Sequence, residues 1–89
     1  MDSLSEPSGA SPTREQIDEE SRRIRRLRIA VNLTLQVIAQ GGATLAEALE
    51  MAEATRRLAL SYFPGKEEVY EILYGSKFRR LIASIYRLN

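Results

Sequence analysis

The chain has 89 residues and contains neither cysteine nor histidine. Without them it lacks disulfides, a thiol nucleophile, the commonest general base and the sulfur and nitrogen ligands of zinc sites. Six glutamates form two acidic groups, but both groups lie near expected helix starts, where the helix dipole favours acids. We therefore expect that the protein is not an enzyme and that it has no metal site and no cofactor. The glutamates are Glu47, Glu50, Glu53, Glu67, Glu68 and Glu71.

Long apolar runs are also missing. The most apolar stretch, Leu27 to Ala39, has 13 residues and is interrupted by Arg28, Asn32 and Gln36, so it is too short and too polar to span a bilayer. The N-terminal residues are acidic and do not resemble a secretory signal. No glycine-rich phosphate loop is present, and the isolated glycines are typical of turns. These observations predict a cytoplasmic protein with no membrane segment and no evident small-molecule substrate.

The first twelve residues, MDSLSEPSGASP, are rich in serine, proline and glycine, with Leu4 as their main apolar side chain. Such a composition cannot bury enough apolar surface to fold. We expect residues 1 to 12 to be a disordered tail and residues 13 to 89 to form a single helical domain. A domain of this size, without disulfides or a metal, has a marginal core, which favours self-association.

A long first helix is expected from about Thr13 to Gln40. Thr13 and Gln16 have the spacing of a capping box, in which each side chain bonds the backbone N–H of the other residue. Acids fill the first turns and arginines follow, as the helix dipole prefers. No glycine or proline occurs between Ser21 and Gln40. Gly41 suits the left-handed position just after a helix.

A strand is the alternative for part of this segment. From Leu27 to Val37 apolar and polar residues alternate, except at Ala30, which is typical of a half-buried strand. A strand followed by two helices resembles the ribbon-helix-helix repressors in element order, and this resemblance implies paired strands that read the DNA major groove. The capping box and the acidic region before the stretch favour the helix.

Two further helical segments follow. Thr44 and Glu47 form a second capping box, and strong helix formers continue to Pro64-Gly65. The last segment has Gly75 at its centre. Because glycine costs about 1 kcal/mol relative to alanine inside a helix, we expect two helices that meet there, with Ser76 capping the second, rather than one continuous helix. The predicted fold is all-α, a small bundle of three helices with the last one broken near Gly75.

The first helix has more apolar surface than two neighbouring helices can bury. Ile17, Ile24, Val31 and Ile38 are seven residues apart and predict its core-facing side. A second apolar set lies beside that line and predicts a partner-binding surface, for a homodimer or for another protein. Its members are Ile29, Leu33 and Val37. The leading hypothesis is therefore a protein-interaction or oligomerisation module with a regulatory or assembly role.

An arginine-rich stretch gives the alternative hypothesis, a nucleic-acid-binding transcriptional regulator. Five arginines and no acid occur between residues 21 and 28, and arginines on a helix can contact phosphates. The net charge of the whole chain is only +1, whereas dedicated nucleic-acid domains are usually strongly basic. The nearby acids favour a solvated or partner-facing charged surface. The arginines are Arg22, Arg23, Arg25, Arg26 and Arg28.

Overall fold

The computed structural model describes residues 13–87, and the tail predicted for residues 1–12 lies outside them. Within this range the chain is helical and has no strand, so the all-α prediction is confirmed. The strand alternative for residues 27 to 37, and with it the ribbon-helix-helix element order, is wrong. The elements are α1 (Arg14–Ala39), α2 (Leu45–Tyr62), α3 (Glu67–Tyr70), the π-helical turn η3 (Glu71–Gly75) and α4 (Ser76–Tyr86).

Both predicted capping boxes are present. The Thr13 hydroxyl accepts from the Gln16 N–H at 3.1 Å, and the Gln16 side chain accepts from the Thr13 N–H at 2.8 Å. Thr44 and Glu47 repeat this geometry with the same two distances. After α1 the backbone turns at Gly41, whose φ of 76° is left-handed and suits glycine. These local signals explain why both long helices begin and end close to their predicted positions.

The alternating pattern of residues 27 to 37 is accommodated in a helix because only one side of α1 is buried. Leu27, Val31 and Ile38 face the bundle and are almost inaccessible to solvent. Leu35 is partly buried against the same core, whereas Ile29, Leu33 and Val37 are exposed on other parts of the helix surface. The helix that begins at the Thr13 cap therefore continues through residues 27 to 37. The apolar–polar alternation of these residues is a coincidence of spacing.

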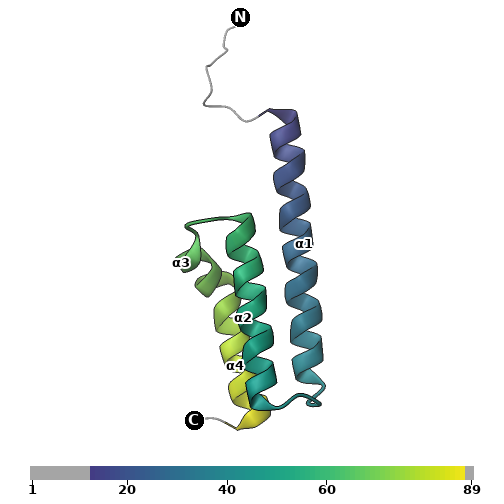
Figure 1. The fold of residues 1–89 in the computed structure, drawn as a ribbon, viewed down its shortest axis with the longest axis vertical. Coiled ribbons are helices and arrows are strands. Elements are labelled where there is room, and N and C mark those ends of the chain that lie inside the picture. Colours follow the sequence, from purple (N-terminus) through teal and green to yellow (C-terminus); the bar gives the residue numbers. More distant parts are fainter. Residues whose placement is uncertain (1–12, 88–89) are drawn as a thin grey trace, which may run out of the picture.

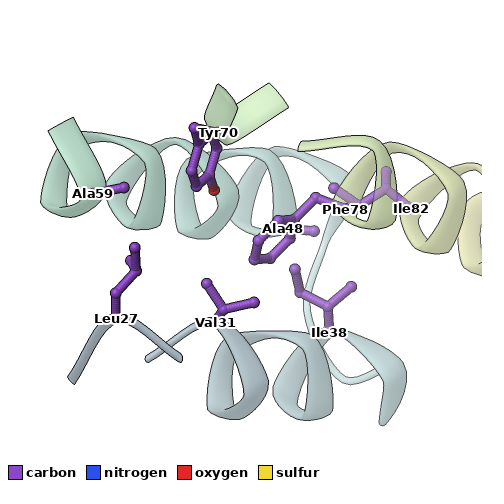
Figure 2. Close-up of a cluster of buried hydrophobic side chains, with 8 residues drawn as sticks. All are labelled: Leu27, Val31, Ile38, Ala48, Ala59, Tyr70, Phe78 and Ile82. Atoms are coloured by element: carbon purple, nitrogen blue, oxygen red, sulfur yellow. The ribbon is translucent and has the colours of Figure 1, made fainter. Parts of the chain in front are cut away.

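Three helices enclose the core. Figure 1 shows α1 and α2 side by side and antiparallel, with α4 running along them in the direction of α1. The small residues Ala48 and Ala59 on α2 are buried and leave room for the side chains of α1. Figure 2 shows how side chains from α1, α2 and α4 meet in one cluster together with Tyr70 of α3. The core consists of Leu27, Val31, Ile38, Ala48, Ala59, Tyr70, Phe78 and Ile82.

Two hydrogen bonds between elements fix how the helices are aligned along their length. The buried Thr55 hydroxyl donates to the Met51 carbonyl at 3.0 Å and shares a second hydrogen bond with the Thr34 hydroxyl at 3.2 Å, which joins α2 to α1. The Tyr86 hydroxyl, at the end of α4, donates to the Ala43 carbonyl in the turn between α1 and α2. The ends of α1 and α4 are therefore held together at the end of the bundle that contains this turn.

The last segment is irregular at Gly75, but it does not break into two capped helices. Gly75 and Ser76 both have right-handed helical dihedral angles, and helical structure continues from α3 through η3 into α4. The Ser76 hydroxyl does not cap α4; it donates to the Ile72 carbonyl at 3.3 Å. The predicted cap was wrong. The irregularity is instead a wider π turn, which accommodates an extra residue without interrupting the helix.

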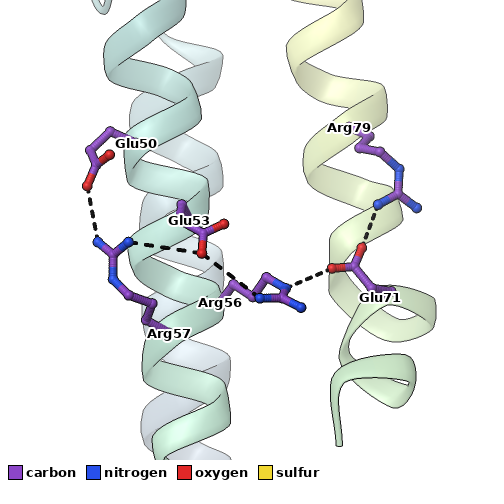
Figure 3. Close-up of polar contacts among 6 residues, drawn as sticks. All are labelled: Glu50, Glu53, Arg56, Arg57, Glu71 and Arg79. Atoms are coloured by element: carbon purple, nitrogen blue, oxygen red, sulfur yellow. Dashed lines mark hydrogen bonds and ion pairs between the residues drawn. The ribbon is translucent and has the colours of Figure 1, made fainter.

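Gly75 is buried, and its important property is the absence of a side chain rather than backbone flexibility. A Cβ atom at Gly75 would collide with the carboxylate of Glu71. That carboxylate accepts a hydrogen bond from Arg56 on α2 at 3.1 Å and is also paired with Arg79 on α4 (Figure 3). These two arginines hold the pKa of Glu71 below its ordinary value, chiefly through their hydrogen bonds. Gly75 thus makes room for a carboxylate that connects α2 with α4.

We predict that Gly75→Ala stabilises the protein less than a glycine-to-alanine change does in an ordinary helix. In an open helix this change gains about 1 kcal/mol, but here the new methyl group displaces the Glu71 carboxylate. The gain should therefore be at most about half as large in the wild type as in a Glu71→Ala background. Urea unfolding of the wild type, Gly75→Ala, Glu71→Ala and the double variant measures this coupling. Equal gains in both backgrounds would contradict the role assigned to Gly75.

Tyr70 has a buried hydroxyl that finds no hydrogen-bond partner among the described residues. Burial raises the pKa of Tyr70 to about 12, from an ordinary value of 10.0. The folded protein therefore keeps this proton at pH values where the unfolded chain releases it. The contribution to stability is complete below pH 10 and declines as the pH rises through 10 to 12.

We predict that Tyr70→Phe leaves stability near neutral pH unchanged or raises it by up to about 1 kcal/mol, because it removes an unsatisfied buried hydroxyl. The variant should also lose less stability than the wild type as the pH rises above 10. Urea unfolding near neutral pH and at alkaline pH checks both effects. A clear loss of stability at neutral pH would show that the hydroxyl has a partner.

Candidate functional site

The two ends of α1 lie in different surroundings because α1 is longer than α2. The Thr34–Thr55 hydrogen bond sets the antiparallel alignment of the two helices. Tyr62, the last residue of α2, lies seven residues after Thr55, and Leu27 lies seven residues before Thr34. The part of α1 before Leu27 therefore extends beyond the end of α2, as Figure 1 shows. We call residues 14–26 the α1 extension.

Two residues of the α1 extension that were expected in the core are exposed instead. Ile17 and Ile24 were predicted to be buried with Val31 and Ile38, but they are 49% and 39% exposed. Both lie on the side of α1 that carries the buried residues further along. Since α2 and α4 do not reach this level, the core-facing side of α1 continues without a cover from the described residues.

The predicted partner-binding residues lie outside the buried side of α1. Ile29, Leu33 and Val37 are 52%, 56% and 46% exposed and follow one another at intervals of four residues. Each is a large apolar side chain that contributes nothing to the core cluster. We call these three residues the outer stripe. The structure thus brings together the residues that the sequence pattern placed on one surface.

The arginine-rich stretch continues this surface toward the N-terminal end of α1. Arg22 and Arg26 precede Ile29 and Leu33 by seven residues each, so they lie in line with the outer stripe. Arg22 is paired with Glu19 at 2.9 Å. Arg23 approaches the same carboxylate at 3.5 Å, and the hydrogen bond and charge of Arg22 lower the pKa of Glu19.

The five arginines do not share one face. Arg25, Arg26 and Arg28 are exposed and form no ion pair within residues 13–87. Arg28 lies on the core-facing side of α1, where it borders a groove with Ile24. Arginines distributed around a helix cannot all reach one phosphate backbone, so the geometry weakens the nucleic-acid hypothesis without removing it.

A groove lies between the α1 extension, the end of α2 and the start of the last helical segment. Its volume is about 380 Å³, and its walls are mainly apolar. Arg28 and Lys66 supply the cationic side chains of its lining. α4 runs beside α2 at the other end of the bundle, away from this groove (Figure 1). The apolar lining includes Ile24, Leu27, Leu60, Phe63, Val69 and Leu73.

Sequence reasoning missed the groove residues Val69 and Leu73 and the neighbouring Ile72, which is also exposed. All three are large apolar residues that lie off the line Tyr70, Tyr74, Phe78. That departure was the available signal. Their exposure depends on where α3 and η3 stand relative to α1, which periodicity does not specify.

Other candidate sites are not supported by the described part of the chain. Residues 13–87 contain no group of three or more acidic side chains placed to hold a metal ion. None of the helices that the structure describes is long and apolar enough to cross a membrane. Tyr74 is half-buried, with the Lys77 ammonium 5.9 Å from its ring centre, and Tyr70 and Phe78 are buried. The aromatic residues thus serve mainly the core.

Comparisons of the chain with protein-family models, with curated proteins and with solved structures found no match. The candidate surfaces therefore rest on the sequence and the geometry of this chain.

Proposed function

We propose that this chain is a non-enzymatic protein-interaction module with a regulatory or assembly role, and that the outer stripe of α1 binds a partner protein. The observation that carries the proposal is the row Ile29, Leu33 and Val37 on α1, each about half exposed, with Val37 at the end of the row that borders Met51 of α2. Apolar side chains in a row on a rigid helix fit the apolar face of another helix.

The two ends of the outer stripe differ in charge. Arg22 and Arg26 stand at one end of the outer stripe, and the polar residues Gln36 and Gln40 lie near the other end. A partner with an apolar centre and acidic side chains toward the arginine end matches this order. Charges beside an apolar contact chiefly set partner choice and association rate, so the arginines act here as specificity elements. A cytoplasmic location is part of the same proposal.

Nucleic-acid binding is the alternative function. It is favoured by the exposure of Arg25, Arg26 and Arg28 and by their having no ion pair within residues 13–87. Phosphate contacts by arginine give affinity that falls steeply with salt. A titration against random-sequence duplex DNA and single-stranded RNA, followed by fluorescence anisotropy at low and at physiological salt, distinguishes the two functions. Submicromolar, salt-sensitive binding that Arg22→Gln/Arg26→Gln abolishes would make the alternative the leading one.

We predict that Leu33→Glu removes partner binding and changes the midpoint of urea unfolding little, because the Leu33 side chain contributes no core contact. Ile72→Glu is the matched control, since Ile72 is an equally large and even more exposed apolar residue on η3, away from the outer stripe. Proximity labelling in cells, followed by quantitative mass spectrometry, compares the two variants with the wild type.

We expect a set of partner proteins that Ile72→Glu labels as strongly as the wild type does and that Leu33→Glu labels at least about tenfold more weakly. The reason is that burying a charge in an apolar interface costs more than about 1.4 kcal/mol. Identical labelling by all three chains would remove the outer stripe as the binding surface.

A further inference from the structure

We propose that the α1 extension is also a homodimerisation element, which pairs antiparallel with the extension of a second copy and inserts Ile17 of each copy into the groove of the other. This interface lies on the core-facing side of α1. It is distinct from the outer stripe and does not depend on the function proposed above.

The first argument is apolar continuity. Ile17 and Ile24 lie seven residues apart on the side of α1 that is buried further along, yet both are substantially exposed. The groove begins at Ile24 and continues along Leu27 to Phe63 and Leu73. The bundle thus leaves two apolar parts of one side uncovered, Ile17 on the core-facing side of the extension and the groove that begins at Ile24. A fourth helix laid antiparallel to the extension would cover both.

The second argument is charge complementarity, which identifies the fourth helix as a second copy. Residues 14 to 20 contain one arginine and four acids, a net charge of 1 − 4 = −3, whereas residues 21 to 28 contain five arginines and no acid, a net charge of +5. An antiparallel pairing places the acidic half of one extension against the basic half of the other. A parallel pairing would place like charges together and is opposed by their repulsion.

The alignment of the two extensions follows from the residues that flank Ile17 and Ile24. Helical periodicity places Asp18 and Arg25, seven residues apart, on one flank of this line. An antiparallel alignment centred between Ser21 and Arg22 brings Asp18 of each copy level with Arg25 of the other.

The same alignment serves the other flank and the apolar line between the flanks. It places Glu20 level with Arg23 of the second copy. Ile17 then lies between the positions of Ile24 and Leu27, at the mouth of the groove. Asp18, Glu20 and Arg25 form no ion pair within residues 13–87, so these groups are available for contacts between copies.

The first test is the molecular mass in solution of the full chain by sedimentation equilibrium. A concentration-dependent dimer is expected, and Ile17→Asp should raise its dissociation constant at least about tenfold, because the change removes an apolar contact twice by symmetry. Ile29→Asp is the matched control, since Ile29 has a similar exposure on the opposite side of α1 and should leave dimerisation unchanged.

A monomer at every concentration up to about 1 mM would overturn the proposal. Loss of the dimer with Ile29→Asp but not with Ile17→Asp would also overturn it, and would assign dimerisation to the outer stripe instead. Circular dichroism of each variant confirms that the helices remain folded.

The second test is the orientation of the pair, and it uses the absence of cysteine from the chain. Variants Ile17→Cys and Ile24→Cys each introduce a single thiol. When the two proteins are mixed and oxidised, an antiparallel dimer favours the mixed disulfide between positions 17 and 24. A preference for disulfides between identical positions would show a parallel dimer and refute the alignment.

The third test exchanges the charges. Asp18→Lys/Glu20→Lys and Arg23→Glu/Arg25→Glu each place like charges across the antiparallel pair, so each protein alone should dimerise at least about tenfold more weakly than the wild type. Mixed together, the two proteins present opposite charges on both flanks and should form a heterodimer. Failure of the mixture to associate better than either variant alone would rule out the proposed charge pairing.

Discussion

The difference in length between α1 and α2 is the constraint on which the other surface features depend. α1 has 26 residues and α2 has 18, so they measure about 39 Å and 27 Å at 1.5 Å per residue. A short turn joins them, and the Thr34–Thr55 bond fixes their alignment. The surplus of α1 must therefore extend beyond α2 at the N-terminal end of α1. The exposure of Ile17 and Ile24 and the open groove beside Phe63 both follow from this surplus.

The final helical segment completes the core at one end of the bundle and leaves it open at the other. α4 contributes Phe78 and Ile82 to the core and is held at its end by the Tyr86 hydroxyl. Before α4, the π turn η3 connects to α3, whose Val69 borders the groove. The Glu71 carboxylate ties this turn to both α2 and α4. The open end thus belongs to a segment that is itself firmly attached, which suits a preformed binding surface.

The fold was largely predictable because its signals are local. The capping residues at Thr13 and Thr44, and the left-handed Gly41, act within a few residues of their positions. What the sequence did not reveal depends on alignment between elements. Ile17 belongs to the same seven-residue series as Val31, and periodicity alone gives both the same environment. Only the end of α2 separates a buried position from an exposed one. The role of Gly75 was missed for the same reason, since it depends on a carboxylate held by Arg56.

The exposure of the outer stripe could be inferred from the sequence because its residues have no place in a two-neighbour packing, whatever the alignment, while its binding role stays a prediction. The uncovered side of the α1 extension, by contrast, could not be recognised without the structure. The two surfaces lie on different sides of one helix, so a helix that pairs with its own copy through Ile17 and Ile24 still presents Leu33 outward. Because an antiparallel pair is symmetric, the two outer stripes would then lie at opposite ends of the dimer. Such a dimer holds two partner molecules apart in a fixed arrangement, which is a geometry suited to assembly.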